Sequence, residues 1–159
     1  MLTEHVEKNL NEQAVQQYLH DHIPLSKAMQ VEVVSVKPDE VVLSAPLAPN
    51  INHKETVFGG SASAVAILAA WSLLHTKLKS TAINSQLVIQ SNTMNYLLPI
   101  NGTFTARSSI ENAEEWPRFV RTLERKGRAR IAVAAVLEFE GQQVGRLTGD
   151  FVALVSAAH

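Results

Sequence analysis

The chain has 159 residues, of which 46% are hydrophobic and 18% charged, so it is long enough for one domain with a buried core. Its formal net charge of −1 gives no overall attraction to nucleic acid or to a membrane surface, and we expect neither as a partner. The absence of cysteine excludes disulfides, thiolate zinc sites and cysteine nucleophiles. Together with the absence of a signal-peptide pattern at the N-terminus, the absence of cysteine predicts a cytoplasmic protein.

The first predicted element is an amphipathic helix over residues 3–22, with Thr3 as its N-cap and Pro24 beyond its end. Its apolar stripe recurs every four residues, at Val6, Leu10, Ala14 and Tyr18. Two β-branched runs follow, over residues 31–37 and 40–45, and the Pro38-Asp39 pair between them predicts a β-hairpin. A loop rich in proline and asparagine then covers residues 46–54.

The longest apolar segment predicts a helix from Gly59 to about Lys79, and this helix is apolar nearly all round. Such a helix must be covered on most sides. Its apolar run over residues 62–74 is too short to span a bilayer and is interrupted by serines. Later strands are predicted over residues 85–97, 102–110, 119–125, 129–139 and 144–155, with a turn at Gly141. Strands joined by short turns favour an antiparallel sheet. We therefore predict one α+β domain over residues 1–159, with an N-terminal helix (1–24) and a core (25–156) in which a long sheet wraps the apolar helix.

Residues 52–61 read Asn-His-Lys-Glu-Thr-Val-Phe-Gly-Gly-Ser and run directly into the apolar helix. The first N–H groups of a helix have no intrahelical acceptor, and the helix dipole places partial positive charge there. Gly60 has no side chain to block the approach of a ligand to these groups. The segment is thus a candidate site for an anion, or for a carbonyl oxygen that becomes one.

This pattern resembles the hot-dog family of acyl-thioester enzymes. The resemblance rests on Asn52, Thr56 and the Gly59-Gly60 pair before an apolar helix, and it covers roughly residues 25–156. The chain is most similar to the thioesterase-like domain that follows a GNAT acetyltransferase domain in some bacterial proteins. That group shows two nearby asparagines and then Phe-Gly-Gly-Ser, here Asn50, Asn52 and residues 58–61, and it includes malonyl-ACP decarboxylases.

The resemblance implies a substrate class and an assembly. The substrates would be acyl thioesters of coenzyme A or of acyl carrier protein. No cofactor would be needed beyond the coenzyme A or phosphopantetheine that the substrate carries. Hot-dog proteins usually pair their sheets across a two-fold axis, so we expect a homodimer or a dimer of dimers.

Two departures from the broader family bear on mechanism. Phe58 stands where many relatives carry the histidine of a His-Gly-Gly motif, and Ile67 stands where many carry an acidic residue on the helix. Residues 57–110 contain no Asp or Glu. The usual general base or nucleophile on the helix is therefore missing.

Four residues are candidates for the chemistry. The N–H groups of Gly60 and Ser61 could polarise a thioester carbonyl, although the glycine pair could equally serve a tight turn. Asn52 could donate to the substrate or orient a water, or it could only form an Asx-turn in its own loop. Glu55 is the one carboxylate near the motif and could activate water, whereas such residues are more often solvated.

Further residues are candidates for substrate binding. Around the motif these are Asn50, Phe58, Gly59 and Ser63, and for Asn50 an Asx-turn is the favoured alternative. Asn92 belongs to an unusually polar strand that could line a pocket, form a subunit seam or face solvent. Arg125 and Arg128 belong to a basic cluster over residues 118–130, which could hold phosphates or an acidic carrier protein, or could surround a solvated turn. We expect no metal site, because the two histidines of His20-Asp21-His22 face different ways on a helix.

Three functions follow from these residues. Thioester hydrolysis agrees with the family, but it needs an activated water. Decarboxylation of a malonyl thioester, which yields acetyl-ACP for fatty acid synthesis, needs a site for an enolate oxygen and no base in its first step. A non-catalytic module that binds acyl carrier protein is the third possibility. Hydrolysis is the preferred interpretation, with decarboxylation second.

Overall fold

The computed structural model describes residues 10–156. The helices are α2 (Glu12–His22), α3 (Pro24–Ala28), the 3-10 turn η1 (Ala48–Asn50), α4 (Gly59–Lys79) and α5 (Glu115–Lys126). The strands are β1 (Glu32–Lys37), β2 (Glu40–Ala45), β3 (Ser85–Tyr96), β4 (Phe104–Ser109), β5 (Arg128–Phe139) and β6 (Gln142–Val155). The α+β class predicted from the sequence is confirmed.

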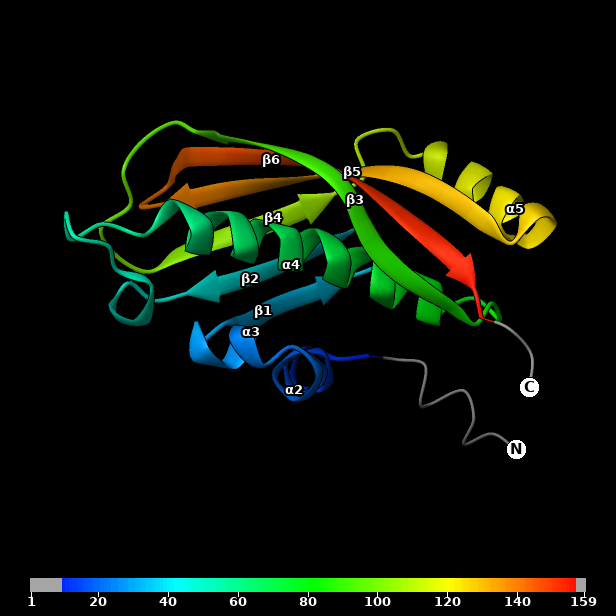
Figure 1. The fold of residues 1–159 in the computed structure, drawn as a ribbon, viewed down its shortest axis with the longest axis horizontal. Coiled ribbons are helices and arrows are strands. Elements are labelled where there is room, and N and C mark those ends of the chain that lie inside the picture. The colour runs from blue at the N-terminus through cyan, green and yellow to red at the C-terminus, as the bar shows by residue number, and fades with distance from the viewer. Residues whose placement is uncertain (1–9, 157–159) are drawn as a thin grey trace.

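All six strands form one antiparallel sheet in the order β1-β2-β4-β5-β6-β3. The sheet curves around α4, which runs along its length (Figure 1). This is the hot-dog arrangement expected from the sequence. Because β3 follows α4 and crosses to the far side of β6, the two edges of the sheet are formed by β1 and β3.

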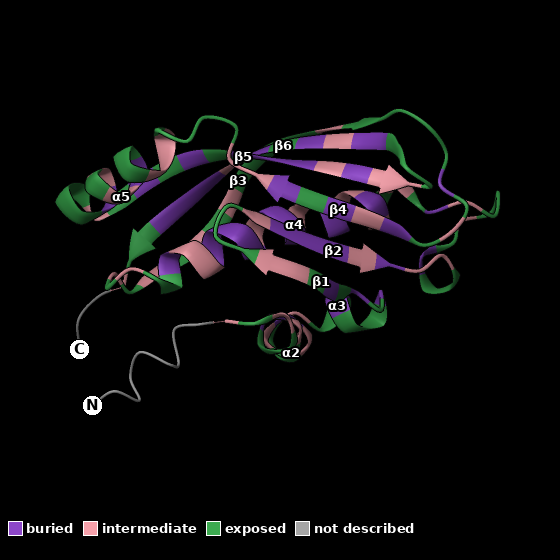
Figure 2. Ribbon diagram, turned by 180° about the vertical axis from the view of Figure 1, so that it is seen from behind, coloured by how far each residue is buried: buried purple, intermediate pink, exposed green. Residues whose placement is uncertain are grey.

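Helix α4 is the centre of the core. It is 21 residues long and apolar enough by length and composition to cross a bilayer, but 11 of its residues are buried within the domain. Alanine is frequent on this helix, at Ala62, Ala66, Ala69 and Ala70, and all four side chains are buried. Buried stretches of α4 are visible behind the sheet in Figure 2. Small side chains let the sheet approach closely, so the helix is covered on most sides, as its sequence predicts.

Two sequence predictions were wrong in detail. Residues 119–125, predicted as a strand, belong to the helix α5, because Trp116, Phe119, Val120 and Leu123 form one apolar face that packs on the core. The first predicted helix is not continuous, since Asn11 is the N-cap of α2 and its Oδ1 accepts from the Ala14 N–H at 2.8 Å. The predicted cap Thr3 lies outside the described residues.

Candidate functional site

The N-terminus of α4 has free backbone donors. Its first intrahelical bond runs from the Ala62 N–H to the Phe58 carbonyl at 3.0 Å, and no side chain caps the helix. The N–H groups of Gly59, Gly60 and Ser61 therefore have no acceptor within residues 10–156. Gly60 is exposed and Ser61 is half-buried, so the end of the helix can be reached from solvent.

A cavity of about 360 Å³ lies against this helix end. Its walls come from the first turn of α4, from the segment after β3 and from the neighbouring strands, and they are mostly apolar: Val57, Gly59, Ala62, Tyr96, Leu97, Leu98, Pro99, Ile100, Leu137 and Val144. Within the part of the chain that the structure describes, the lining contains no carboxylate and no basic side chain. The cavity can therefore hold an aliphatic group against the first turn of α4, at Gly59 and Ala62.

Tyr96 joins the end of β3 to the start of α4. Its hydroxyl donates to the Gly59 carbonyl at 3.0 Å, and a Cβ on Gly59 would meet the tyrosine ring at 3.4 Å. Tyr96 is 57% exposed, and Leu97 and Leu98 beside it are also exposed. The bond fixes the first helical residue against the sheet, and it leaves an apolar rim around the cavity.

Phe58 packs its ring on the bare α-carbon of Gly60. A Cβ at Gly60 would lie only 2.4 Å from Cε2 of that ring, so the position requires glycine as long as the ring stays in place. The ring itself is 57% exposed. Phe58 therefore lies at the entrance to the helix N-terminus, in the position where the broader family carries histidine.

Asn52 organises the loop that leads into α4. Its Oδ1 accepts from the Lys54 N–H at 2.8 Å, which is an Asx-turn, and from the Thr56 N–H at 3.2 Å. The Thr56 hydroxyl donates to the same oxygen at 3.3 Å. The Asn52 side-chain nitrogen forms no hydrogen bond within residues 10–156 and remains available as a donor.

Asn50 is a structural residue of the same loop. It is only 2% exposed, and its Nδ2 donates to the carbonyls of Met29 at 3.0 Å and Pro46 at 2.8 Å. These bonds tie the loop before α4 to the end of α3, and they use both amide hydrogens. The Asn50 side chain therefore has no donor left for a substrate. Its role is structural, but it is not the Asx-turn expected from the sequence, because its buried Oδ1 accepts no hydrogen bond within residues 10–156.

The remaining predicted residues are dispersed. Glu55 is exposed at the loop tip, with a left-handed φ of 63°. Ser61 and Ser63 are half-buried on the first turns of α4, and neither lines the cavity. Asn92 is exposed on β3 and lines a separate small cavity with Thr148.

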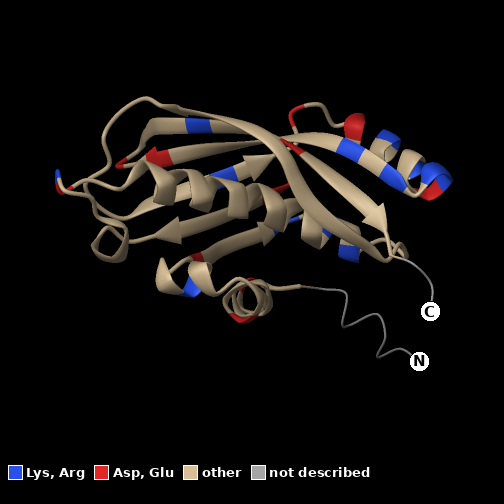
Figure 3. Ribbon diagram, in the orientation of Figure 1, with Lys and Arg blue, Asp and Glu red and all other residues tan. Residues whose placement is uncertain are grey.

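The basic cluster lies at the other end of the molecule. Figure 3 shows Lys and Arg concentrated on α5 and on the adjoining start of β5, whereas α4 begins at the opposite end of the long axis in Figure 1. Arg125 and Arg128 are exposed, and neither forms an ion pair within residues 10–156. One protomer therefore does not bring these residues to the cavity.

Sequence reasoning missed most of the cavity wall. Tyr96 is the last residue of a strand, and Leu98 and Ile100 follow in the connection to β4. No local pattern marks them as neighbours of Gly59, because they reach it through the pairing of β3 with β6. The one available signal was the run Tyr96-Leu97-Leu98 at a strand end, where three large apolar residues are unusual in a connection.

The fold and the helix-end cavity define the class of hot-dog thioesterases. Residues 12–155 match the family described as "Putative thioesterase (yiiD_Cterm)", and the chain belongs to this family. A thioesterase family acts on thioesters by hydrolysis, and this general activity is the one that the family assigns.

Solved structures share this fold. The chain is 32% identical to a protein of unknown function from Chlorobaculum tepidum TLS, over 91% of this chain and 94% of that one, with a TM-score of 0.84. It is 25% identical to a putative thioesterase from Shewanella oneidensis, over 90% and 96% of the two chains, with a TM-score of 0.80. A thioesterase from Haemophilus influenzae shares the fold, at 14% identity over 95% of both chains and a TM-score of 0.77.

Proposed function

We propose that the protein hydrolyses acyl thioesters of coenzyme A or acyl carrier protein at the N-terminus of α4. The thioester oxygen would accept from the N–H groups of Gly60 and Ser61. The observation that carries this proposal is that these donors have no acceptor within residues 10–156, and that Gly59 and Ala62 of the same helical turn line an apolar cavity. Water adds to the carbonyl carbon, the N–H groups stabilise the resulting oxyanion, and the C–S bond breaks to release an acid and a thiol.

The cavity indicates an aliphatic acyl group. Its lining is apolar, and Tyr96, the one hydroxyl-bearing side chain among the described residues that line it, is already bonded to the Gly59 carbonyl. Burying an acyl chain among Leu98, Ile100 and Val144 removes apolar surface from water and supplies binding energy away from the reacting carbonyl.

Activation of the water falls to the loop before α4. The free Nδ2 of Asn52 can orient the water or the substrate, and Glu55 is the nearest carboxylate along the chain. Substitution Glu55→Gln keeps the shape of the side chain and removes its basicity. A loss of turnover without a change in substrate affinity would support Glu55 as the base, and unchanged turnover would remove it from the mechanism.

Decarboxylation of malonyl-ACP is the second candidate. The observation that favours it is the absence of any carboxylate from the cavity lining within residues 10–156. Loss of carbon dioxide leaves an enolate oxygen, which the same N–H groups would stabilise, and a proton from water then completes acetyl-ACP. The first step needs no base. Non-catalytic binding of acyl carrier protein is the remaining alternative.

We also propose that the protein forms a dimer through β3. This strand is at the edge of the sheet, it is 12 residues long, and exposed apolar side chains lie along it and beyond it, at Val88, Tyr96, Leu97 and Leu98. A strand that pairs with its own copy about a two-fold axis does so antiparallel, so Ser85 would approach Tyr96 of the partner subunit. A monomer by light scattering at micromolar concentration would contradict this.

Such a dimer would bring the basic cluster toward a site. The start of β5 carries Arg128, which pairs through Leu154 of β6 with Gln86 at the start of β3. The start of β3 would lie beside the end of β3 in the partner subunit, and therefore near the partner's cavity. Arg125 and Arg128 of one subunit would then attract the phosphates or the acidic carrier of a thioester bound to the other.

One assay separates the candidate reactions. The protein is incubated with malonyl-ACP, acetyl-ACP and acyl-CoAs of increasing length, and free thiol and carbon dioxide are measured separately. Hydrolysis predicts thiol release without carbon dioxide, and it predicts that aliphatic acyl groups react. Carbon dioxide without thiol would establish decarboxylation instead. If neither product forms but the substrates still bind, the remaining interpretation is a non-catalytic module that binds acyl carrier protein.

A further inference from the structure

The two edge strands of the sheet differ in how many side chains from the rest of the chain bond to their backbone. The strand order places β1 at one edge and β3 at the other. Backbone N–H and C=O groups on an edge strand can pair with another chain unless something covers them. Within residues 10–156, the backbone of β3 is bonded to one side chain, that of Trp71, whose Nε1–H donates to the Leu87 carbonyl at 3.3 Å. The β1 edge is bonded much more extensively.

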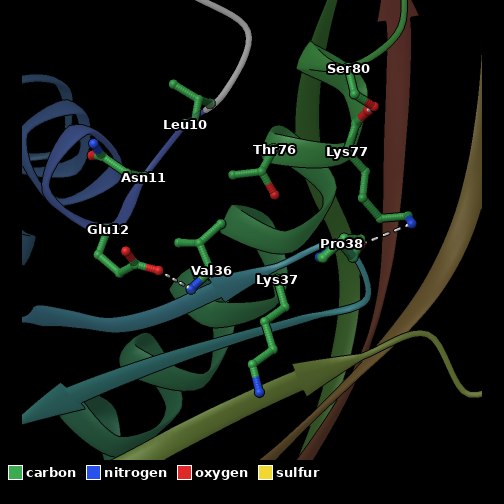
Figure 4. A pocket seen from close by; sticks show the side chains of 9 residues that line it. All are labelled: Leu10, Asn11, Glu12, Val36, Lys37, Pro38, Thr76, Lys77 and Ser80. Carbon is green, nitrogen blue, oxygen red and sulfur yellow. Dashed lines mark hydrogen bonds between the residues drawn. The ribbon is translucent and has the colours of Figure 1, made fainter. Parts of the chain in front are cut away.

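Three side chains of α2 bond to the backbone at the β1 edge. The Val33 N–H donates to Oε1 of Gln16 at 2.9 Å. The Val36 N–H donates to Oε2 of Glu12 at 2.8 Å, as Figure 4 shows. Just before the strand, His20 Nε2–H donates to the Val31 carbonyl at 2.8 Å. These side chains occupy the hydrogen-bonding positions that a neighbouring strand would use.

The spacing of these contacts matches a helix to a strand. Glu12, Gln16 and His20 are four residues apart, so they form one stripe that advances about 6 Å per step along α2. Two residues of a strand advance about 6.6 Å. A register irregularity between Val33 and Ser35 adds one residue to β1 and explains why the second bonded N–H is at Val36. One polar stripe of α2 therefore follows the strand edge.

Another face of α2 holds the helix in place. Val15 and Leu19 are fully buried in the core. The Tyr18 ring lies 4.6 Å from the His75 ring of α4, between centroids, and 4.1 Å from the His22 ring. The helix is thus anchored by apolar and aromatic contacts, and its polar stripe is left to face β1.

We propose that α2 masks a second assembly edge, and that the partner which fits this edge is β1 of another copy of the chain. A masked β1 leaves only the β3 edge for association, which closes as a finite assembly. With both edges uncovered, each copy could join two others, and the assembly would extend as an open chain. The proposal rests on the β3 dimer proposed above and not on the reaction, and its tests measure no activity.

The test is the double variant Glu12→Ala/Gln16→Ala, with Gln13→Ala/Gln17→Ala as a matched control on the exposed face of α2. Hydrogen exchange of the Val33 and Val36 amides and mass by light scattering over a range of concentrations are measured. We expect about tenfold faster exchange at both amides, as for the loss of one hydrogen bond each, and a mass that rises above wild type with concentration. The control should match wild type in both.

A third variant tests whether the additional copies associate through the β1 edge. Val34 is 53% exposed on β1, and a lysine on an edge strand opposes pairing. Adding Val34→Lys to the double variant should return the mass to the wild-type value. Faster amide exchange with an unchanged mass, or a raised mass that Val34→Lys does not lower, would overturn the proposal. If the double variant does not fold, the single variant Gln16→Ala is tested instead, by hydrogen exchange of the Val33 amide and by mass, with the same expected and contradicting results.

Discussion

The buried histidine of α4 makes a quantitative prediction about acid stability. The His75 side chain is 8% exposed; its ring stacks on Trp71 at 4.5 Å and contacts Tyr18 at 4.6 Å, between ring centroids. Burial, and then the charges of Lys79 and His22, lower the pKa of His75 from 6.5 to about 4. The folded protein therefore keeps this ring neutral at pH values where the unfolded chain protonates it.

The sign of the effect follows from proton binding. Above pH 6.5 the ring is neutral in both states, so His75 adds no pH dependence. Between pH 6.5 and about 4 only the unfolded state gains the proton, so the free energy of unfolding falls as the pH falls. At about 1.4 kcal/mol for each pKa unit, the full shift corresponds to about 3.5 kcal/mol. Because the ring keeps some contact with solvent, we expect about 2 kcal/mol by pH 4.5.

Urea unfolding at pH 7 and pH 4.5 tests this value in wild type and in His75→Phe, which keeps an aromatic ring in the stack. The stability lost between the two pH values should be about 2 kcal/mol smaller in the variant. His53→Phe, at an exposed loop histidine, controls for the loss of one histidine. Equal losses in wild type and His75→Phe would refute the reasoning.

Four further outcomes are expected. Asn50→Ala removes two buried bonds and should lower the free energy of unfolding by about 2–3 kcal/mol in urea titrations; a change below about 0.5 kcal/mol would contradict the structural role. Asn52→Ala should abolish turnover with little loss of fold, and Asn52→Asp should remain inactive because a carboxylate cannot donate; an active Asn52→Asp would limit the residue to its loop. Gly60→Ala should lower kcat/KM about 100-fold by displacing the Phe58 ring, and adding Phe58→Ala should recover part of the loss; no recovery would exclude the ring as the cause. Leu98→Trp should narrow the cavity and shift the preference to shorter acyl chains in a kcat/KM series; an unchanged preference would place the acyl chain elsewhere.

The core of the fold follows directly from sequence patterns. The apolar segment from Gly59 to Lys79 is the helix α4 with those same ends, and the β-branched runs on either side of Pro38-Asp39 are the hairpin β1–β2. These segments have strong periodicity and clear turn residues at their ends. Local patterns were sufficient there because the local preference and the tertiary packing agree.

The helix α5 shows where the local interpretation failed. Trp116, Phe119, Val120 and Leu123 have helical spacing, whereas the sequence analysis predicts a strand over residues 119–125. Pro117 falls in the first turn, where a helix tolerates proline because that N–H has no intrahelical acceptor. The spacing of the four apolar residues was the signal that should have decided the assignment.

The candidate site likewise has one part that could be predicted from the sequence and one part that could not. The glycine pair and the helix end were visible in the sequence, whereas the cavity wall is assembled by long-range pairing. Tyr96 reaches Gly59 only because β3 returns along β6, and Leu137 and Val144 come from the two strands after α5. The role of Asn50 also depends on a carbonyl 21 residues away, at Met29. Contacts between residues so far apart in the chain cannot be predicted from a local sequence pattern.

The central claim is that the N-terminus of α4 polarises a thioester carbonyl. The most direct measurement is the infrared stretch of a ¹³C-labelled carbonyl in a bound acyl-CoA analogue whose sulfur is replaced by CH₂, so that it cannot be hydrolysed. Bound to the wild-type protein, this carbonyl should absorb at a lower frequency than in water, because the Gly60 and Ser61 N–H groups stabilise charge on its oxygen. Binding of the analogue with an unshifted carbonyl frequency would contradict the account.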